Sequence, residues 1–472
     1  HSPPQSNQVN EASNEKLQLR LYGEMYDVTG FAQIHPGGAA ILRHVSQMNM
    51  PDATSLFESY HALRDAGEMR QKLASYAVRT GKKEQELFTF KQNGLYRDLR
   101  RRVASRLREE FADASPKLKA PKRAWWCFAK VCFGTTFCFC MLHVAIRAER
   151  IPLAIGASVC AGMALSSAIL FELMHGASHF AISSDSSTNV LLNSIAQPVL
   201  YWNAGIWQAH HVLHHHSYTG SLPLDPDMTH LFPIMIKTTE TGGKSSLLQP
   251  FWVKMIECIF FPGLHALQAG QYASMLWPSI VKTREPDKLL DAVSGRSLKR
   301  RDLWALPKSG LSGKLYACDS GLVQHVLLTW LPLWVSLLLF KSGGPPKQRG
   351  LRAIACSLAL VVTLNFSYCV NIFPDHDTLA SATARDEFVA ARARNASSET
   401  GADWAELQVR GSANWGGPLW CFFFGGINYQ IEHHLFPSLY PGYYPLIAPI
   451  VRDACRDHGV PYAHFPSIFE AW

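Results

Sequence analysis

The sequence predicts a multi-domain protein in which a small α+β unit precedes an all-α membrane domain with four transmembrane helices in two hairpins, plus interfacial helices. Three observations lead to this prediction. Four apolar runs are long enough to cross a bilayer, short apolar stretches separated by turns fill residues 17–80, and many of the 20 histidines stand beside the apolar runs. The composition agrees, because 47% hydrophobic and 17% charged residues exclude a long disordered chain.

Charge and cysteine content narrow the class of partner and compartment. The net charge is +8, but the basic residues form short clusters, at 117–123 and 299–301. Such clusters suit a membrane surface better than a nucleic-acid groove, so we expect no nucleic-acid partner. The 11 cysteines are scattered without a CxxC pair, which indicates small core residues in a reducing compartment. The chain begins with His1, so nothing follows about a targeting peptide.

Changes in composition along the chain predict five segments. The polar start and the basic stretch before the first apolar run mark the main boundaries. The predicted segments are a disordered tail at 1–16, a small α+β domain at 17–90, a linker with a helix at 91–123, a membrane domain at 124–460 and a C-terminal tail at 461–472.

The four apolar runs are predicted to span the membrane, since a bilayer requires about 20 residues of helix. Short connectors join them in pairs, which predicts hairpins. Buried helices of a large soluble protein are the alternative, but four runs in two pairs favour membrane spans. More broken apolar stretches at 186–207 and 250–281 are expected to be amphipathic helices at the interface. The four predicted spans are 124–146 with 151–174, and 321–340 with 352–373.

Two histidine clusters have metal-ligand spacing. His175 and His179, in "HGASH", are four residues apart, so both rings point the same way on a helix. One such pair also occurs by chance on surface helices. The second cluster, "WQAHHVLHHHSYTG", has five histidines in seven residues; a surface tract is the alternative, but the aromatic residues around it argue for a buried site. Its candidate ligands are His211, His215 and His216.

The third cluster is the adjacent pair His433 and His434 in "GGINYQIEHHLFP". Neighbouring helix residues project about 100° apart, so two metal ions, each taking one imidazole, fit this pair better than one ion does. His376, at the end of the fourth run, would join the same face. We expect eight ligands, four for each of two metals: His175, His179, His211, His215, His216, His376, His433 and His434. Imidazole suits zinc, copper, iron and nickel, so the histidines alone do not choose the metal.

A further pair, His35 in "HPGG" and His61 in "FESYH", stands among apolar residues of the small unit. Two imidazoles on either side of an apolar pocket can hold a flat macrocycle such as haem. A haem with both axial positions filled cannot bind O₂ and passes single electrons. An electron donor fused to a histidine-rich centre points to iron and O₂ chemistry.

These motifs resemble two known families. Residues 17–80 resemble cytochrome b5, with His35 and His61 as the axial ligands. Residues 124–460 resemble front-end membrane fatty acid desaturases, whose three histidine boxes match "HGASH", "HVLHHH" and "QIEHH" in order and spacing. We use the term histidine box for these three motifs below.

The resemblance implies a function. It implies insertion of a cis double bond between an existing double bond and the carboxyl end of a polyunsaturated acyl chain, supplied as acyl-CoA or acyl-phospholipid. The implied cofactors are haem b and two iron ions; the implied partners are O₂, a lipid membrane and NADH-cytochrome b5 reductase. Gln430 is expected behind the metal ligands as an orienting, catalytically important residue.

Three other functions stay open on the sequence. They are a sphingoid long-chain-base desaturase or fatty-acyl hydroxylase, a membrane-anchored haem electron carrier, and a zinc hydrolase. We expect an endoplasmic reticulum membrane location with haem and metal facing the cytosol. The basic cluster 117–123 favours this orientation, whereas the basic residues of the 341–352 loop, expected on the far side, argue against it.

Overall fold

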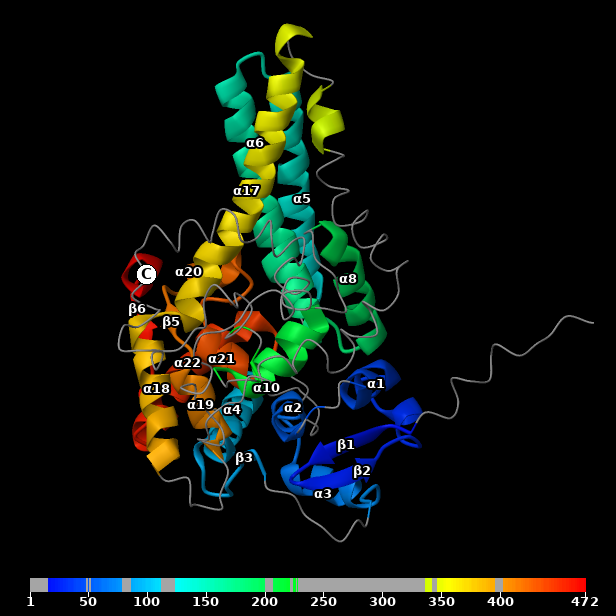
Figure 1. Cartoon of the computed structure of the whole chain (residues 1–472), viewed down its shortest axis with the longest axis vertical. Coiled ribbons are helices and arrows are strands. Elements are labelled where there is room, and N and C mark those ends of the chain that lie inside the picture. Colours follow the sequence, from blue (N-terminus) through cyan, green and yellow to red (C-terminus); the bar gives the residue numbers. More distant parts are fainter. Residues whose placement is uncertain are drawn as a thin grey trace, which may run out of the picture.

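Three long helices project from a helical body that carries the small N-terminal unit at its opposite end (Figure 1). The computed structural model describes the following residues: 16–47, 50, 52–78, 86–111, 124–199, 207–220, 224–225, 227, 336–341, 346–394 and 402–472.

The small unit contains a β-hairpin and short helices. Strands β1 (Gln18–Leu21) and β2 (Glu24–Asp27) pair antiparallel, with Leu21 opposite Glu24. Tyr22 and Gly23 have φ of 53° and 74°, and positive φ at both central residues is typical of a tight two-residue hairpin turn. The helical elements that follow are η2 (Ala32–Ile34), α1 (Ala39–Gln47), α2 (Thr54–Tyr60) and α3 (Ala66–Ala74). The predicted α+β unit is therefore present.

The long helices include two of the predicted spans as a hairpin. α5 (Ala124–Arg147) turns back into α6 (Ile151–Leu165), which continues as the π-helix η3 (Ser166–His175) and α7 (Gly176–Ser178). η8 (Pro346–Gln348) leads into α17 (Arg349–His376). Three helices in the described part of the chain are long and apolar enough to cross a membrane: Trp125–Arg147, Ile151–Ser178 and Pro346–His376. Most of the predicted span 321–340 lies outside the described residues, so the fourth span and the second hairpin stay predictions.

Arg352 ties the far end of α17 to the far end of α5. Its side chain is fully buried, and its guanidinium donates to the backbone carbonyls of Ala145, Ile146 and Ala148. These carbonyls belong to the last turn of α5 and the residue after it, where no following turn of helix supplies a donor. A cation at a helix C-terminus also interacts favourably with the helix dipole. Arg352 is therefore a buried cap that holds α17 against the end of α5.

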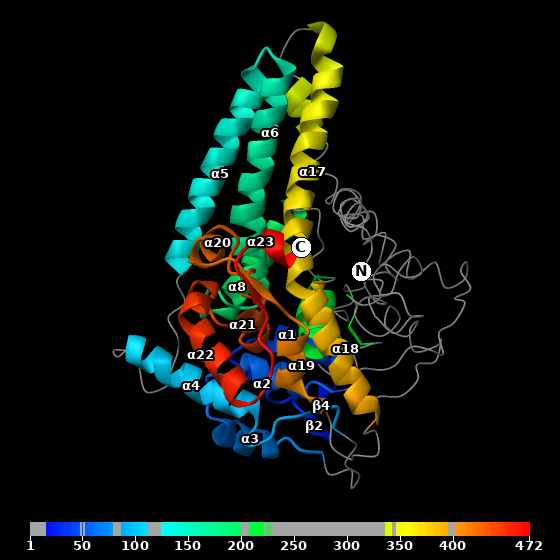
Figure 2. The same ribbon diagram turned by 90° about the vertical axis from the view of Figure 1, so that its left-hand side faces the viewer.

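Short helices and strand pairs form the body below the long helices (Figure 2). Figure 2 also shows α22 beside α4, where Arg102 and Asp457 form an ion pair of 2.7 Å. The helices of the body are α4 (Leu95–Glu110), α8 (Ser186–Val199), η4 (Gln208–His215), α10 (His216–Tyr218), α18 (Leu379–Arg394), α19 (Trp404–Arg410), α20 (Pro418–Phe423), α21 (Gln430–Leu435), η9 (Pro441–Tyr443), α22 (Tyr444–Asp457) and α23 (Ile468–Ala471). Two parallel strand pairs join distant segments: β3 (Phe88–Thr89) with β4 (Ala402–Asp403), and β5 (Asn414–Trp415) with β6 (His464–Phe465).

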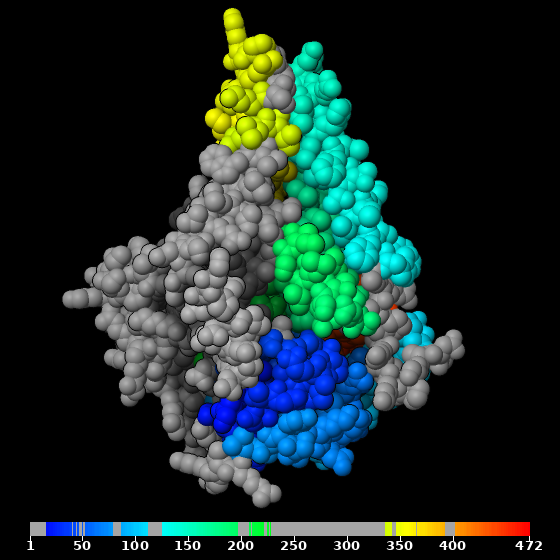
Figure 3. All heavy atoms as spheres, turned by 90° about the vertical axis from the view of Figure 1, so that its right-hand side faces the viewer, coloured from blue at the N-terminus to red at the C-terminus, as the bar shows by residue number. Residues whose placement is uncertain are grey.

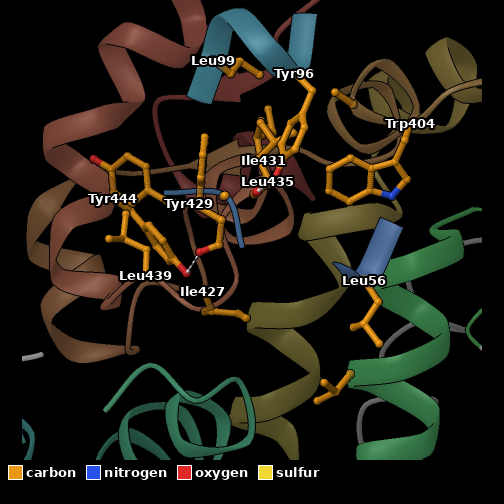
Figure 4. Close-up of a cluster of buried hydrophobic side chains, with 14 of the residues drawn as sticks. Leu56, Tyr96, Leu99, Trp404, Ile427, Tyr429, Ile431, Leu435, Leu439 and Tyr444 are labelled. Carbon is orange, nitrogen blue, oxygen red and sulfur yellow. Dashed lines mark hydrogen bonds between the residues drawn. The ribbon is translucent and has the colours of Figure 1, made fainter. Parts of the chain in front are cut away.

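One apolar core runs through the body and into the small unit. Figure 4 shows Leu56 of α2, Tyr96 of α4 and Trp404 of α19 in the same region as Leu435 of α21. The rings of Tyr96 and Trp404 are 5.0 Å apart in an edge-to-face arrangement, which is favourable for aromatic pairs. The space-filling view shows the small unit directly against α8 (Figure 3). The two parts of the molecule therefore share a packed interface.

The structure adds detail to several predicted segments. α8 covers part of the predicted interfacial stretch 186–207, whereas 250–281 lies outside the described residues. The residues predicted as a C-terminal tail form β6 and α23, and the Trp472 indole donates to the carbonyl of Val370 on α17 at 3.0 Å. β3, assigned by prediction to the small domain, pairs instead with β4 of the C-terminal part. Neither pairing is visible in local sequence, because the partners are far apart in the chain.

Candidate metal centre and haem site

The eight histidines of the predicted ligand set meet where η3 and α17 end, at His175 and His376. Two groups have ligand nitrogens within 4.8 Å of one another. The first group is His175, His179, His211 and His433, and the second is His215, His376 and His434. His216 lies between them: its Nε2 is 3.3 Å from Nε2 of His211, and its ring stacks on that of His434 with centroids 4.2 Å apart. The adjacent pair His433 and His434 is divided between the groups.

Two π-helices place the first and second histidine boxes. η3 ends at His175, and η4 carries His211 and His215. A π-helix closes its hydrogen bonds between residues five apart, and it occurs frequently at functional sites. Accordingly, His211 lies beside His216, which is five residues further along the chain. His215 belongs to the other group, and its Nε2 is 3.2 Å from Nε2 of His376. The spacing of four between His211 and His215 thus separates these two side chains into different groups.

Hydrogen bonds at Nδ1 orient most of the imidazoles from outside. A ring whose Nδ1–H donates to an oxygen presents its Nε2 lone pair to a metal. Nδ1 of His376 is 2.8 Å from the carbonyl oxygen of Gly411, and Nδ1 of His434 is 2.8 Å from Oε1 of Gln408. The other partners are the Asp225 carboxylate for His215 at 3.1 Å, the Tyr444 hydroxyl for His433 at 3.2 Å and the Tyr60 hydroxyl for His179 at 2.9 Å. Five of the eight imidazole rings are therefore oriented by a hydrogen bond between Nδ1 and a residue outside the ligand set.

The inward nitrogens fit a metal ion. Nε2 of His179 and Nε2 of His433 are buried and have no hydrogen-bond partner among the described residues. A buried polar atom without a partner is costly, and a metal ion would remove that cost. Burial also lowers the pKa of His179, His211, His433 and His434 well below the ordinary value, with the neighbouring imidazoles lowering it further. The rings are therefore neutral at physiological pH, which is the form that binds metal.

Gln430 lies within the second group. Its amide nitrogen is 2.9 Å from Nε2 of His376 and 3.1 Å from Nε2 of His434. Its Oε1 is buried without a partner among the described residues. Because the two ends of an amide are assigned from their surroundings, a half-turn would direct the oxygen to the same place. Gln430 therefore lies beside the ligand nitrogens of the second group, whereas the sequence predicted a position behind the ligands.

The loop before α21 fixes the third histidine box against η3. Gly425 has φ of 56°, and a Cβ there would lie 2.4 Å from the carbonyl oxygen of Phe171 in η3. The Asn414 side chain accepts from the Ile431 backbone at 2.9 Å and donates to the Glu432 carboxylate at 2.7 Å. Burial raises the pKa of Glu432 to about 7 despite this hydrogen bond. Glycine at 425 therefore permits the close approach of the third box to the first.

His35 and His61 form a separate pair in the small unit, with ring centroids 6.3 Å apart. Nδ1 of His35 lies 3.2 Å from the carbonyl oxygen of Gly38, and Nδ1 of His61 lies 2.7 Å from that of Phe57. Both Nε2 atoms therefore keep a lone pair for a metal. Burial lowers the pKa of His61 to about 4, so this ring is neutral. A Cβ at Gly37 would lie 2.7 Å from the His35 ring, which explains the glycine of "HPGG". The pair fits haem.

Comparison with known proteins agrees with both sites. Residues 150–466 match the model of the family described as fatty acid desaturase. The chain belongs to the fatty acid desaturase family. Residues 6–81 match the cytochrome b5-like haem/steroid binding domain. The predicted oxygen-dependent desaturase with a cytochrome b5-like unit is therefore confirmed, and the haem carrier without desaturase function is not favoured.

Curated relatives cover nearly the whole desaturase chain. The chain is 26% identical to an acyl-lipid (7-3)-desaturase from Chlamydomonas reinhardtii, over 95% of this chain and 77% of the relative. It is 26% identical to an acyl-lipid (8-3)-desaturase from Mortierella alpina, over 97% and 91%. It is 24% identical to a delta(8)-fatty-acid desaturase from Arabidopsis thaliana, over 94% and 85%.

Sequence reasoning did not find the partners that orient the desaturase histidines. Tyr60 and Tyr444 carry no local motif, and each meets its histidine only through the fold. Asp225 had a signal, because "DPD" follows the second box closely. His210, omitted from the predicted ligands, pairs through Nε2 with Asp227 at 2.5 Å.

Proposed function

We propose that this desaturase acts at the front end of its substrate, placing a cis double bond between an existing double bond and the carboxyl end of a polyunsaturated acyl chain. One observation carries the proposal. Two neighbouring groups of buried imidazoles lie at the near ends of the membrane helices, beside a unit with a paired-imidazole haem site. The relatives named as acyl-lipid (7-3)- and (8-3)-desaturases support this choice of substrate.

The proposed cofactors are two iron ions and one haem b. The eight histidines would hold the irons, four imidazoles for each, with the Gln430 amide at the second group. His35 and His61 would hold the haem. Iron at this centre supplies the O₂ chemistry needed to break an unactivated C–H bond, which a carboxylate or imidazole base cannot do alone.

The protein's own residues orient the rings and exclude water. Asp225, Gln408, Tyr444 and Tyr60 fix the imidazoles through Nδ1. The apolar side chains packed around the cluster keep bulk water away from it. Fixed ligand orientation and a dry surrounding both control a metal site, and losing an outer partner typically costs about 10–100-fold in metal affinity or activity.

We further propose that the protein resides in the endoplasmic reticulum membrane, with haem and metal sites on the cytosolic face and NADH-cytochrome b5 reductase as electron donor. α18 and the third histidine box lie on the same side of the spans as the metal cluster (Figure 1). The "NAS" sequon at Asn395, directly after α18, should then remain unglycosylated. A glycosidase-sensitive mass shift that Asn395→Gln removes would place this side in the lumen instead.

Product analysis tests the proposed reaction. The protein is expressed in yeast, one polyunsaturated acid is fed at a time, and the position of each new double bond is mapped by mass spectrometry. We expect new bonds only on the carboxyl side of an existing one, and none with His434→Ala. Hydroxylated acids or desaturated long-chain bases as the sole products would overturn the proposal. Acyl-CoA and phospholipid pools, sampled at early times, identify the substrate form.

A further inference from the structure

The helix that precedes one haem-site histidine touches the metal cluster directly. α2 ends at Tyr60, and His61 is the next residue. The Tyr60 hydroxyl lies 2.9 Å from Nδ1 of His179, and the two rings are nearly parallel with centroids 6.5 Å apart. The covalent bond between neighbours and one hydrogen bond therefore link the haem site to the first metal group.

α2 is also connected to the other two histidine boxes through residues beside them. The Tyr218 hydroxyl, just after the second box, donates to the carbonyl of Asp52, two residues before α2 begins. The Tyr96 hydroxyl lies 3.3 Å from the Glu58 carbonyl on α2 and 3.1 Å from the Leu435 carbonyl at the end of α21. α2 thus contacts the first box directly through Tyr60, and two tyrosine hydroxyls connect it or the residues before it to the segments that follow the second and third boxes. Figure 1 shows α2 between the β1–β2 hairpin and α10.

A buried ionic cluster fixes α2 against α4. The Glu58 carboxylate, 2% exposed, accepts from Arg97 at 2.9 Å, from Arg100 at 2.6 Å and from the Tyr22 hydroxyl at 2.6 Å. Arg100 additionally donates to the carbonyl of His61 at 3.0 Å. Charge-assisted bonds of this kind are strong, and a buried charge that loses its partners is costly. The cluster therefore resists separation of the small unit from the body.

We propose that α2 is a fixed bridge between the two cofactor sites, and that Tyr60 is a positioning residue that couples the haem site to the metal centre through His179. This inference rests on the proposed function, and it excludes a haem unit that must leave and return during turnover. The Tyr60 hydroxyl accepts the Nδ1–H of His179, which leaves Nε2 for the metal. A hydrogen-bonded histidine is both more basic and better oriented, so the contact affects the site that receives electrons.

Each electron transfer across the bridge is balanced without a proton. A haem held by His35 and His61 would supply one electron, and a metal ion held by the first group would receive it. A reduced flavoprotein would then restore the electron to the haem. Tyr60 itself is neither oxidised nor deprotonated in this scheme.

Haem reoxidation in purified holoenzyme tests the bridge. Wild type, Tyr60→Phe and the matched control Tyr26→Phe are reduced, mixed with oxygenated acyl substrate and followed by haem absorbance. Tyr26 is a buried tyrosine of the same unit whose hydroxyl bonds Glu24 at 3.2 Å, so the control also loses one hydroxyl contact. We expect reoxidation in Tyr60→Phe to slow about tenfold or more, as for other lost outer partners, with less than a twofold change in the control.

Three further readouts separate coupling from misfolding. The haem spectrum and iron per protein should match wild type in Tyr60→Phe, and amide exchange of residues 54–61 should stay slow. Arg100→Met should accelerate that exchange, with or without bound metal, because the ionic cluster fixes α2.

Fast exchange of residues 54–61 in wild type would overturn the fixed bridge. Unchanged reoxidation in a Tyr60→Phe protein that still makes product would overturn the role of Tyr60. Failure of the proposed function is a different result: wild type makes no front-end product, although its reoxidation still depends on Tyr60.

Discussion

Replacing Gly425 with alanine should weaken the metal centre without touching a ligand. The residue has φ of 56°, and its new Cβ would lie 2.4 Å from the Phe171 carbonyl oxygen. Carbon–oxygen contacts normally begin near about 3.3 Å, so the loop and η3 must separate by roughly 1 Å. The left-handed conformation costs alanine about 1–2 kcal/mol, and the forced shift in a packed interior adds about 1–3 kcal/mol. We expect a total destabilisation of about 2–5 kcal/mol.

The same shift separates the first box from the third, and metal distances tolerate only about 0.2 Å. Iron per protein should therefore fall together with the apparent melting temperature in detergent. Gly417→Ala is the control, because a Cβ there meets nothing within 4 Å and its φ of −152° is extended. A Gly425→Ala protein with the iron content and melting temperature of Gly417→Ala would refute this reasoning.

Three further predictions follow from the contacts described above. Arg352→Met leaves three carbonyls at the end of α5 without their donor and should lower the free energy of unfolding by about 2–4 kcal/mol. The apparent melting temperature in detergent measures this loss, and the exposed control Lys347→Met should stay near wild type. His61→Ala should abolish the low-spin haem spectrum while iron in the membrane domain stays near normal, and equal loss of both cofactors would argue against separate sites. Gln430→Ala should lose turnover by about 10–100-fold and retain more iron than His434→Ala, as measured by metal analysis beside product formation; equal iron loss would make Gln430 a ligand as essential as His434.

Hydropathy and histidine spacing predicted the general organisation of the chain because both signals are local. The apolar runs that form α5, α6 and α17 are long enough to predict membrane spans from hydropathy alone. His175 and His179, four residues apart, lie in the same group of ligands, as their spacing predicts. The division of His433 and His434 between two groups also follows from the angle between neighbouring helix residues.

The pairing within the second box could not be read in the same way. An α-helical period places His211 and His215 together, but η4 is a π-helix and brings His211 to His216 instead. Nothing in composition signals the wider turn, since it depends on how the segment packs against the rest of the cluster. The role of Tyr60 was equally hidden, because 119 residues separate it from His179.

The buried position of Arg352 bears on how the chain is oriented during synthesis. The positive-inside rule counts cations near the ends of membrane spans, and Lys341, Lys347, Arg349 and Arg352 lie near the end of α17 opposite the cluster. One of these four charges is engaged by the carbonyls at the end of α5 and does not face water. Its acceptors all belong to the end of α5, so α17 buries this charge only when it lies beside α5. Only Lys341, Lys347 and Arg349 among these four cations remain exposed, so the charge bias that opposes a cytosolic metal face is smaller by one cation than the sequence alone indicates.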